Sequence, residues 1–216
     1  MIHNLGSTNS VLNNFVGELR DITIQHDRWR FRKNLERIAV MIGYEISKRM
    51  KYAPRRVKTP LAEIEVDVLA EVPVLGTIFR AGLAMHEGLL QVFDRADNAF
   101  ISAFRKHSSD GKFEIELEYV SCPSLDQRVL IICDPMLATG ASISKTIKAL
   151  LVHGKPREIH LACAIAAQPG IEKLQKELPE VEIWTGAIDP QLDENSYIVP
   201  GLGDAGDLAY GEKAQK

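Results

Sequence analysis

The chain has 216 residues, of which 45% are hydrophobic and 25% are charged, and its formal net charge is −3. These values are typical of a folded globular protein, so they exclude a disordered, collagen-like or disulfide-rich chain. A small negative net charge also gives no general attraction to nucleic acid or to anionic membranes. Any phosphate group that the protein binds must therefore be held by a local site.

The cysteines bear on the cellular compartment. Cys122, Cys133 and Cys163 cannot all pair within one chain, and the last two lie inside apolar runs. Buried free thiols are typical of a reducing compartment. No apolar run reaches the ~18 residues that a membrane span needs, and residues 1–10 show no secretory signal. We therefore expect a cytoplasmic protein with no membrane partner.

The first half of the chain mixes helical and extended patterns. In chain order it predicts an irregular start over 1–14, a helix over 27–50, a strand over 66–75 and a short helix over 82–93. The long helix depends on Leu35, Ile38, Ile42 and Ile46, whose three- and four-residue spacing gives one apolar face. These elements favour a mixed α/β chain.

Residues 99–120 carry a different signal. An apolar run at 99–104 predicts a strand, and residues 108–111 (Ser-Ser-Asp-Gly) predict a turn. Apolar residues then alternate with glutamates over 113–119, which indicates a second strand with one solvated face. We therefore expect 99–120 to form a hairpin-like β-arm rather than a crossover in the core.

The second half has the rhythm of a parallel sheet. Apolar runs predict strands over 129–133, 159–166 and 181–184, and helical spacing predicts helices over 143–151 and 171–178. Strands that alternate with helices in this way form a parallel sheet with crossover helices. Ligands of such sheets bind at the carboxyl ends of the strands, which directs attention to the residues that follow Cys133.

The loop over residues 134–142 combines a carboxylate, two hydroxyls and a glycine where a strand ends and a helix begins. Free N–H groups and the helix dipole favour an anion there, and Gly140 permits close approach of the backbone. Thr139 and Ser142 offer hydroxyl donors, and Asp134 can accept hydrogen bonds from sugar hydroxyls. The alternative is a plain helix start with Ser142 or Thr139 as the N-cap. The loop has neither a Walker A motif nor a G-x-G-x-x-G motif, which disfavours triphosphate hydrolysis and dinucleotide binding.

Residues 129–142 resemble the phosphoribosyl diphosphate (PRPP) signature of type I phosphoribosyltransferases, in the form typical of the uracil phosphoribosyltransferase family. Two positions depart from the general pattern: Pro135 replaces a second acidic residue, and Ala141 replaces a second glycine. The resemblance implies PRPP contacts from Asp134, Pro135, Met136, Leu137, Ala138, Thr139, Gly140, Ala141 and Ser142. It also implies one α/β domain over 1–216, with a parallel sheet flanked by helices, a β-arm and a C-terminal base-binding hood over 188–211.

A glycine-rich segment over 197–207 is the second signal. Its glycines at 201, 203 and 206 are incompatible with a regular helix or strand, so the backbone groups are free to read a base by hydrogen bonds. The alternative is an ordinary surface turn. The segment resembles the uracil-binding motif of the same family, which implies that Ile198, Gly203, Asp204 and Ala205 contact uracil and that Asp204 also meets PRPP. The segment has no Lys or Arg, which argues against orotate as the base.

Two arginines at predicted strand ends complete the expected site. Arg80 and Arg105 match family arginines that contact PRPP, although a single arginine is more often a solvated surface charge. Arginine suits the role because its planar fork binds phosphate oxygens in pairs. We expect Asp134, Arg105 and Asp204 to be the catalytic residues, and an unusual peptide conformation near Gly76.

The resemblance implies transfer of a phosphoribosyl group from PRPP to uracil, which gives UMP and diphosphate, with Mg²⁺ carried by PRPP near Asp204. It also implies a homodimer or larger assembly, and it leaves GTP open as an effector. The six histidines show no metal-ligand spacing. The rival interpretations are a related transferase for another base and a nucleotide sensor that binds RNA, for which the basic run between Arg49 and Lys58 is the best support.

Overall fold

The structure is a computed structural model that describes residues 1–107 and 113–213, without the side chains of 103–107 and 113–117. The turn expected at 108–111 therefore lies outside the described residues.

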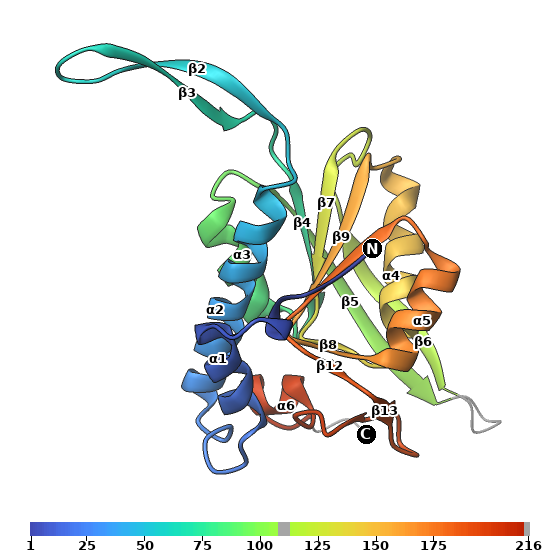
Figure 1. Cartoon of the computed structure of the whole chain (residues 1–216). Helices are drawn as coiled ribbons and strands as arrows, with labels where there is room; N and C mark the ends of the chain where they lie inside the picture. Colours follow the sequence, from blue (N-terminus) through green and yellow to red (C-terminus); the bar gives the residue numbers. More distant parts are fainter. Residues whose placement is uncertain (108–112, 214–216) are drawn as a thin grey trace.

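A seven-stranded sheet forms the centre of the protein, in the order β1-β11-β9-β7-β4-β5-β6 (Figure 1). The strands are β1 (Ile2–Asn4), β4 (Val74–Phe79), β5 (Asp97–His107), β6 (Phe113–Ser121), β7 (Val129–Cys133), β9 (Glu158–Cys163) and β11 (Val181–Thr185). All neighbouring strands pair in parallel except β5 and β6. The mostly parallel sheet confirms the predicted fold class.

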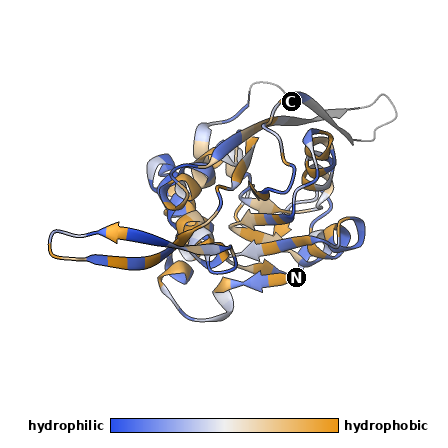
Figure 2. Cartoon of the chain, turned by 90° about the horizontal axis from the view of Figure 1, so that it is seen from above, coloured by the Kyte–Doolittle hydropathy of each residue, from blue (hydrophilic) through white to orange (hydrophobic). Residues whose placement is uncertain are grey.

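Helices cover both faces of this sheet (Figure 1). On one side lie α1 (Val11–Arg20), α2 (Arg28–Ser47) and α3 (Leu83–Val92), and on the other lie α4 (Ala141–Leu150) and α5 (Gln168–Glu177). Short 3-10 helices span Leu5–Ser7 and Leu151–His153. Apolar residues of the central strands lie between the layers (Figure 2), and every residue of β7 is fully buried. No helix in the described ranges combines the length and hydropathy of a membrane span.

The start of the chain is more regular than predicted. β1 extends the sheet by pairing with β11, and α1 begins at a capping box in which Ser10 and Asn13 bond each other's backbone N–H groups. β1 has only three residues, which is too short for an alternation of apolar and polar residues to be recognised. α1 could have been predicted, because Leu12, Val16 and Leu19 recur at helical spacing. All three side chains are buried.

The single strand predicted over 66–75 is wrong. The run contains the end of β3 (Glu63–Leu69) and the start of β4, which are separated by a connection that includes Pro73. β3 pairs with β2 (Tyr52–Lys58) in an antiparallel hairpin that projects from the body of the protein (Figure 1). The apolar run hid this boundary, because β-branched residues continue on both sides of it. We call residues 52–69 the arm.

The hairpin expected over 99–120 does form, but it does not stand apart from the central sheet as an arm. β5 and β6 do pair as antiparallel strands, but residues 97–102 of β5 also pair in parallel with β4. The hairpin thus belongs to the central sheet, and β6 is its edge strand. The alternating pattern of β6 is that of a sheet edge, which has one solvated face just as an arm has.

Two small sheets lie at the carboxyl end of the parallel strands. β8 (Met136–Leu137), β10 (Ile165–Ala167) and β12 (Ile188–Asp189) form a parallel three-stranded sheet with β10 in the middle. β13 (Gln191–Leu192) and β14 (Ile198–Val199) form an antiparallel pair, and the short helix α6 (Ala205–Tyr210) follows. Residues 188–211, from β12 through α6, are the segment that we call the hood.

Candidate active site

The amino end of α4 is open to an anion. Its N-cap is Gly140, which has a φ of 75° and provides no side-chain cap, so the predicted alternative of a helix capped by Thr139 or Ser142 is wrong. A Cβ atom on Gly140 would lie 2.9 Å from the carbonyl oxygen of Gly170 at the start of α5. Only glycine combines this left-handed conformation with so close an approach.

The first turn of α4 retains free hydrogen-bond donors. The N–H of Ala141 donates to Oγ1 of Thr139 at 3.3 Å, and the N–H of Ser144 donates to the carbonyl oxygen of Gly140 at 2.9 Å. Within the described ranges, the N–H groups of Ser142 and Ile143 have no partner. Such groups, with the helix dipole behind them, bind phosphate.

Asp134 follows β7 directly, and its carboxyl group has an unusual environment. Its N–H donates to the carbonyl oxygen of Ala162 at 3.1 Å, and its Oδ1 accepts a hydrogen bond from the N–H of Met136 at 3.3 Å. Burial raises the pKa of Asp134 to about 7, the hydrogen bond from Met136 opposes the rise, and the nearby carboxylate of Asp204 adds to it. The structure thus brings the 134–142 loop and the hood into electrostatic contact.

The rest of the loop is held by backbone pairing. The carbonyl oxygen of Pro135 accepts from the N–H groups of Ala164 and Ile165 at 3.0 and 3.1 Å, and β8 then pairs with β10. Leu137 is fully buried, while Ala138 is partly exposed. Pro135 therefore acts through its carbonyl group, which any residue at this position could supply.

Asp204 begins the short helix of the hood. Oδ1 of Asp204 caps α6 by accepting a hydrogen bond from the N–H of Asp207 at 2.9 Å. Ile198 and Ala205 are buried, whereas Gly203 is exposed and has a φ of 92°. Gly206 lies inside α6, so the expectation that all three glycines of this segment avoid a helix is wrong for Gly206.

Arg80 joins the hood to the first half of the chain. Its Nη2 donates to Oδ1 of Asp207 at 2.9 Å and its Nη1 donates to the carbonyl oxygen of Gly211 at 3.0 Å. The remaining guanidinium donors have no partner within the described ranges. The peptide bond between Phe79 and Arg80 is cis, so the unusual peptide lies three residues later than the one expected near Gly76.

Arg105 lies in β5, but its side chain is outside the described residues. Its expected contact with PRPP therefore stays a prediction.

Sequence analysis missed an ion pair that joins α1 to the first strand of the hood, β12. The guanidinium of Arg20, at the end of α1, donates to both carboxylate oxygens of Asp189 at 2.7 and 2.8 Å. The pair also holds both backbone groups of Gly201. The sequence shows that Arg20 is basic and Asp189 is acidic, but it does not show that they pair, because they are 169 positions apart.

The comparison with known proteins decides the family. A model of the family described as "Uracil phosphoribosyltransferase" matches residues 7–212. The chain belongs to the uracil phosphoribosyltransferase family. This confirms the resemblance found in the sequence.

Relatives of this family are similar over nearly the whole chain. A uracil phosphoribosyltransferase from Porphyromonas gingivalis is 53% identical and covers 99% of this chain and 99% of its own length. One from Pyrococcus furiosus is 38% identical, over 90% of this chain and 84% of its own. A solved structure, the AQ2163 protein from Aquifex aeolicus, is 31% identical with a TM-score of 0.88, covering 99% of this chain and 100% of that one.

Proposed function

We propose that this protein transfers the phosphoribosyl group of PRPP to uracil, which yields UMP and diphosphate. In this reaction N1 of uracil forms a bond to the anomeric carbon, its proton is lost, and diphosphate leaves with the electrons of the broken C–O bond. The observation that carries the proposal is the uncapped amino end of α4, in the same loop as Asp134, whose carboxyl group interacts electrostatically with Asp204 of the hood. The family of the chain supports the choice of base.

Each group at the site has a task in this proposal. The free N–H groups of Ser142 and Ile143 bind the 5′-phosphate, for which a helix amino end is suited. Asp134 accepts hydrogen bonds from the ribose hydroxyls, which favour its ionised form. Arg80 stabilises charge on the departing diphosphate through its unused donors. Catalysis then depends on positioning and electrostatics rather than on a covalent intermediate.

Mg²⁺ fits this site as a partner of PRPP. Among the described residues, no group of three or more His, Cys, Asp or Glu side chains could hold a metal ion alone. Two neighbouring carboxylates, Asp134 and Asp204, supply the hard oxygen atoms that Mg²⁺ prefers when substrate phosphates and water complete its shell. When bound, the ion neutralises diphosphate oxygens. We assign the direct contact between the protein and Mg²⁺ to the carboxylate of Asp204.

The test is UMP formation from uracil, PRPP and Mg²⁺ by the purified full chain, with orotate, hypoxanthine and guanine as competing bases. We expect turnover with uracil alone. Turnover with a purine only would show that the hood reads another base. The absence of basic residues from 197–207 supports uracil over orotate, since an orotate carboxylate needs a cation.

The structure weakens the support for an RNA-binding sensor. In the register of the arm, Arg56 stands opposite Glu65 and Lys58 stands opposite Glu63. Side chains opposite each other share one face of a hairpin, so much of the basic run faces acidic residues. An RNA-binding surface needs a field of one sign, and this face carries both signs.

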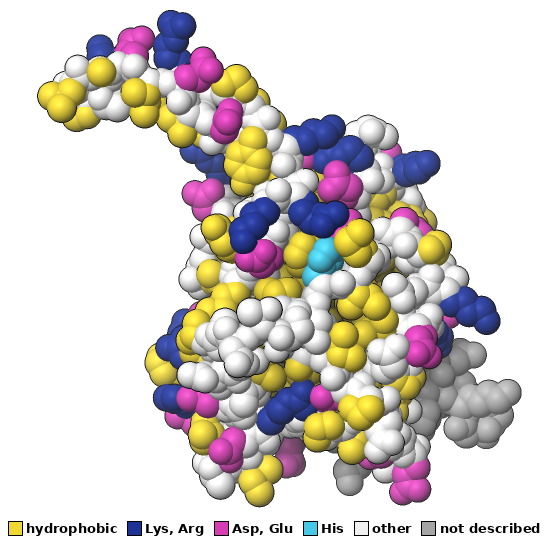
Figure 3. Space-filling model, in the orientation of Figure 1, with side chains coloured by type: hydrophobic (Ala, Val, Ile, Leu, Met, Phe, Trp, Pro, Cys, Tyr) yellow, Lys and Arg dark blue, Asp and Glu magenta, His cyan; other side chains and the backbone are white. Residues whose placement is uncertain are grey.

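The other face of the arm supports association with a second copy. Val57 stands opposite Ile64, and Val66 stands opposite Arg55, so three of these four residues are apolar. Ile64 is 50% exposed. In Figure 3 the arm extends well away from the body of the protein. Burial of this face against another protomer would remove apolar surface from water. We assign the arm to a homodimer or larger assembly.

Light scattering on the purified protein tests the assembly. Ile64→Lys places a charge on the apolar face of the arm, and we expect it to lower the mass toward that of a monomer. Glu65→Lys, on the opposite face, is the matched control and should leave the mass unchanged. A wild-type protein that is monomeric at micromolar concentration would contradict the assignment.

The cellular location and a GTP effector are the two remaining assignments. The three cysteines are unpaired, which accords with a reducing, cytoplasmic location. GTP as an effector is a prediction from the family resemblance, and UMP formation with and without GTP tests it.

A further inference from the structure

The ion pair between Arg20 and Asp189 holds the backbone of Gly201, at the start of the turn of the hood. The N–H of Gly201 donates to Oδ2 of Asp189 at 3.0 Å, and the carbonyl oxygen of Gly201 accepts from Nη1 of Arg20 at 2.9 Å. Within the described ranges, the backbone of Leu202 and Gly203 makes no hydrogen bond. Backbone hydrogen bonds therefore hold this turn at Gly201, while the buried side chain of Leu202 packs it against the core.

Both charged partners are fixed to the body of the protein. Asp189 ends β12, whose neighbour β10 pairs in turn with β8 of the 134–142 loop. Arg20 ends α1, a helix anchored by the buried side chains of Leu12, Val16 and Leu19. The pair thus connects the turn to two rigid elements. Gly201 itself has a φ of 60°, a conformation that suits glycine.

The burial of this pair is not explained by stability. The side chain of Asp189 is 6% exposed and that of Arg20 is 22% exposed. Desolvation of two such charges offsets much of their attraction, so apolar residues at these positions would serve stability equally well. What apolar residues cannot supply is an acceptor and a donor for the two backbone groups of Gly201.

We propose that Arg20 and Asp189 are positioning residues that set the conformation of the base-reading turn, and so control the affinity for uracil rather than for PRPP. This inference rests on the proposed function, because it assumes that residues 203–205 contact the base. Neither side chain touches the substrate in this account. Both act through Gly201.

The experiment compares variants of the full chain in UMP formation. Arg20→Lys keeps the charge but loses the paired donors, so we expect the KM for uracil to rise about tenfold or more while the KM for PRPP changes less than about twofold. Asp189→Asn keeps an acceptor for Gly201 and should give a smaller rise of the same kind. Equal changes in both KM values, or no change in a folded variant, would overturn the inference.

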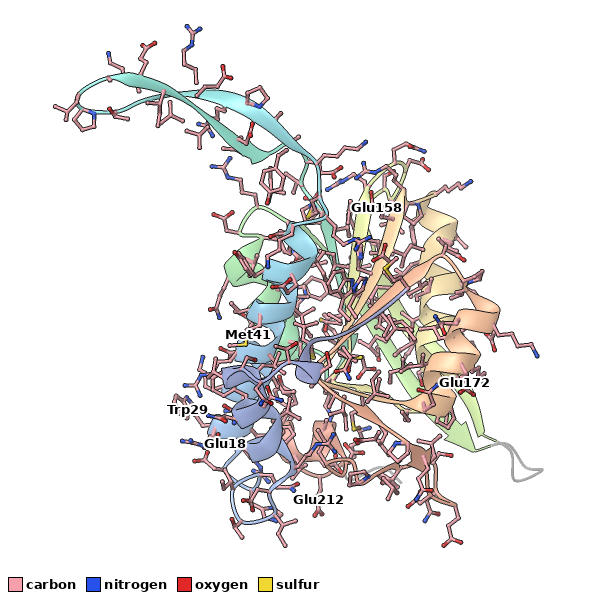
Figure 4. The ribbon with its side chains drawn as sticks, in the orientation of Figure 1. Glu18, Trp29, Met41, Glu158, Glu172 and Glu212 are labelled. Atoms are coloured by element: carbon pink, nitrogen blue, oxygen red, sulfur yellow. The ribbon has the colours of Figure 1, made fainter. Side chains whose placement is uncertain are left out.

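Arg157→Lys is the matched control. The side chain of Arg157 is 24% exposed and also binds carboxylates, those of Glu71 and Glu158. It lies at the opposite end of the sheet: in Figure 4, Glu158 is at the upper end, whereas Glu212 is beside α6 at the lower end. We expect this variant to leave both KM values unchanged.

Hydrogen exchange on the wild-type protein tests the same idea without any variant. The amide of Gly201 should exchange slowly, because it donates to a buried carboxylate, while the amide of Gly203 should exchange freely. Equal, fast exchange at both positions would overturn the inference even if the variants do not fold. A wild-type protein that makes no UMP would contradict the proposed function instead.

Discussion

Replacement of Asp134 by asparagine should stabilise the free protein while it impairs turnover. The pKa of Asp134 is about 7 in the folded protein, against an ordinary value of 3.8. Between those two pH values the folded protein holds a proton that the unfolded chain has released, so the free energy of unfolding falls as the pH rises through this window. Asparagine keeps the acceptor for the N–H of Met136 and removes the charge.

The size of the effect follows from the two pKa values. Their difference corresponds to about 4 kcal/mol above pH 7. Because Asp134 is a partly exposed residue, solvent screening lowers the expected gain to about 2 kcal/mol. At pH 5 most of the gain should disappear, since the carboxyl group is then largely protonated in the folded wild type.

Urea unfolding of the wild type and Asp134→Asn at pH 5 and pH 8 measures this difference. UMP formation by the same preparations should show a fall in kcat/KM for PRPP of about tenfold or more, because the ribose loses a charged acceptor. In the wild type, kcat/KM for PRPP should fall below about pH 7 as Asp134 takes up its proton. A variant no more stable than the wild type at pH 8 would refute the reasoning.

Three other substitutions test the site. Asp204→Asn removes a carboxylate that raises the pKa of Asp134, so the acid limb of kcat/KM for PRPP should move to lower pH, and an unmoved midpoint would contradict the coupling. Gly140→Ala puts a Cβ atom on a residue with a φ of 75° and 2.9 Å from the carbonyl oxygen of Gly170. We expect a loss of about 1–2 kcal/mol in urea unfolding, and an unchanged midpoint would count against the close approach. Arg80→Lys should raise the KM for PRPP about tenfold without loss of structure by circular dichroism, and an unchanged KM would remove its role.

The central strands and the 134–142 loop could be predicted because their signals are local. β7 occupies the predicted residues 129–133, since a strand buried on both faces must be apolar throughout. Gly140 marked the start of the next helix, although its conformation was not readable. The helix is capped by Gly140 itself, and neither its positive φ nor its close approach to Gly170 can be predicted from the local sequence.

The arm and the support of the hood could not be predicted in this way. β2 contains Pro54, Arg55, Arg56 and Lys58, a composition typical of a loop, and it is a strand because it pairs with β3. The ion pair of Arg20 and Asp189 depends on a contact across most of the chain. One sequence shows which side chains are charged but not which of them meet.

The small sheet of β8, β10 and β12 has a consequence for how such a protein can change. Its two strand-to-strand steps set the 134–142 loop and the base of the hood about 10 Å apart. The residues proposed to contact the base follow β12, whereas the loop that precedes α4 lies before β10. Hood residues that do not interact with Arg80 or Asp134 can therefore be exchanged without moving the 134–142 loop. Asp204, Asp207 and Gly211 are the exceptions, because they interact with one or the other. The small sheet thus fixes the spacing between the loop and the base of the hood, while Arg80 links the hood to the first half of the chain through Asp207.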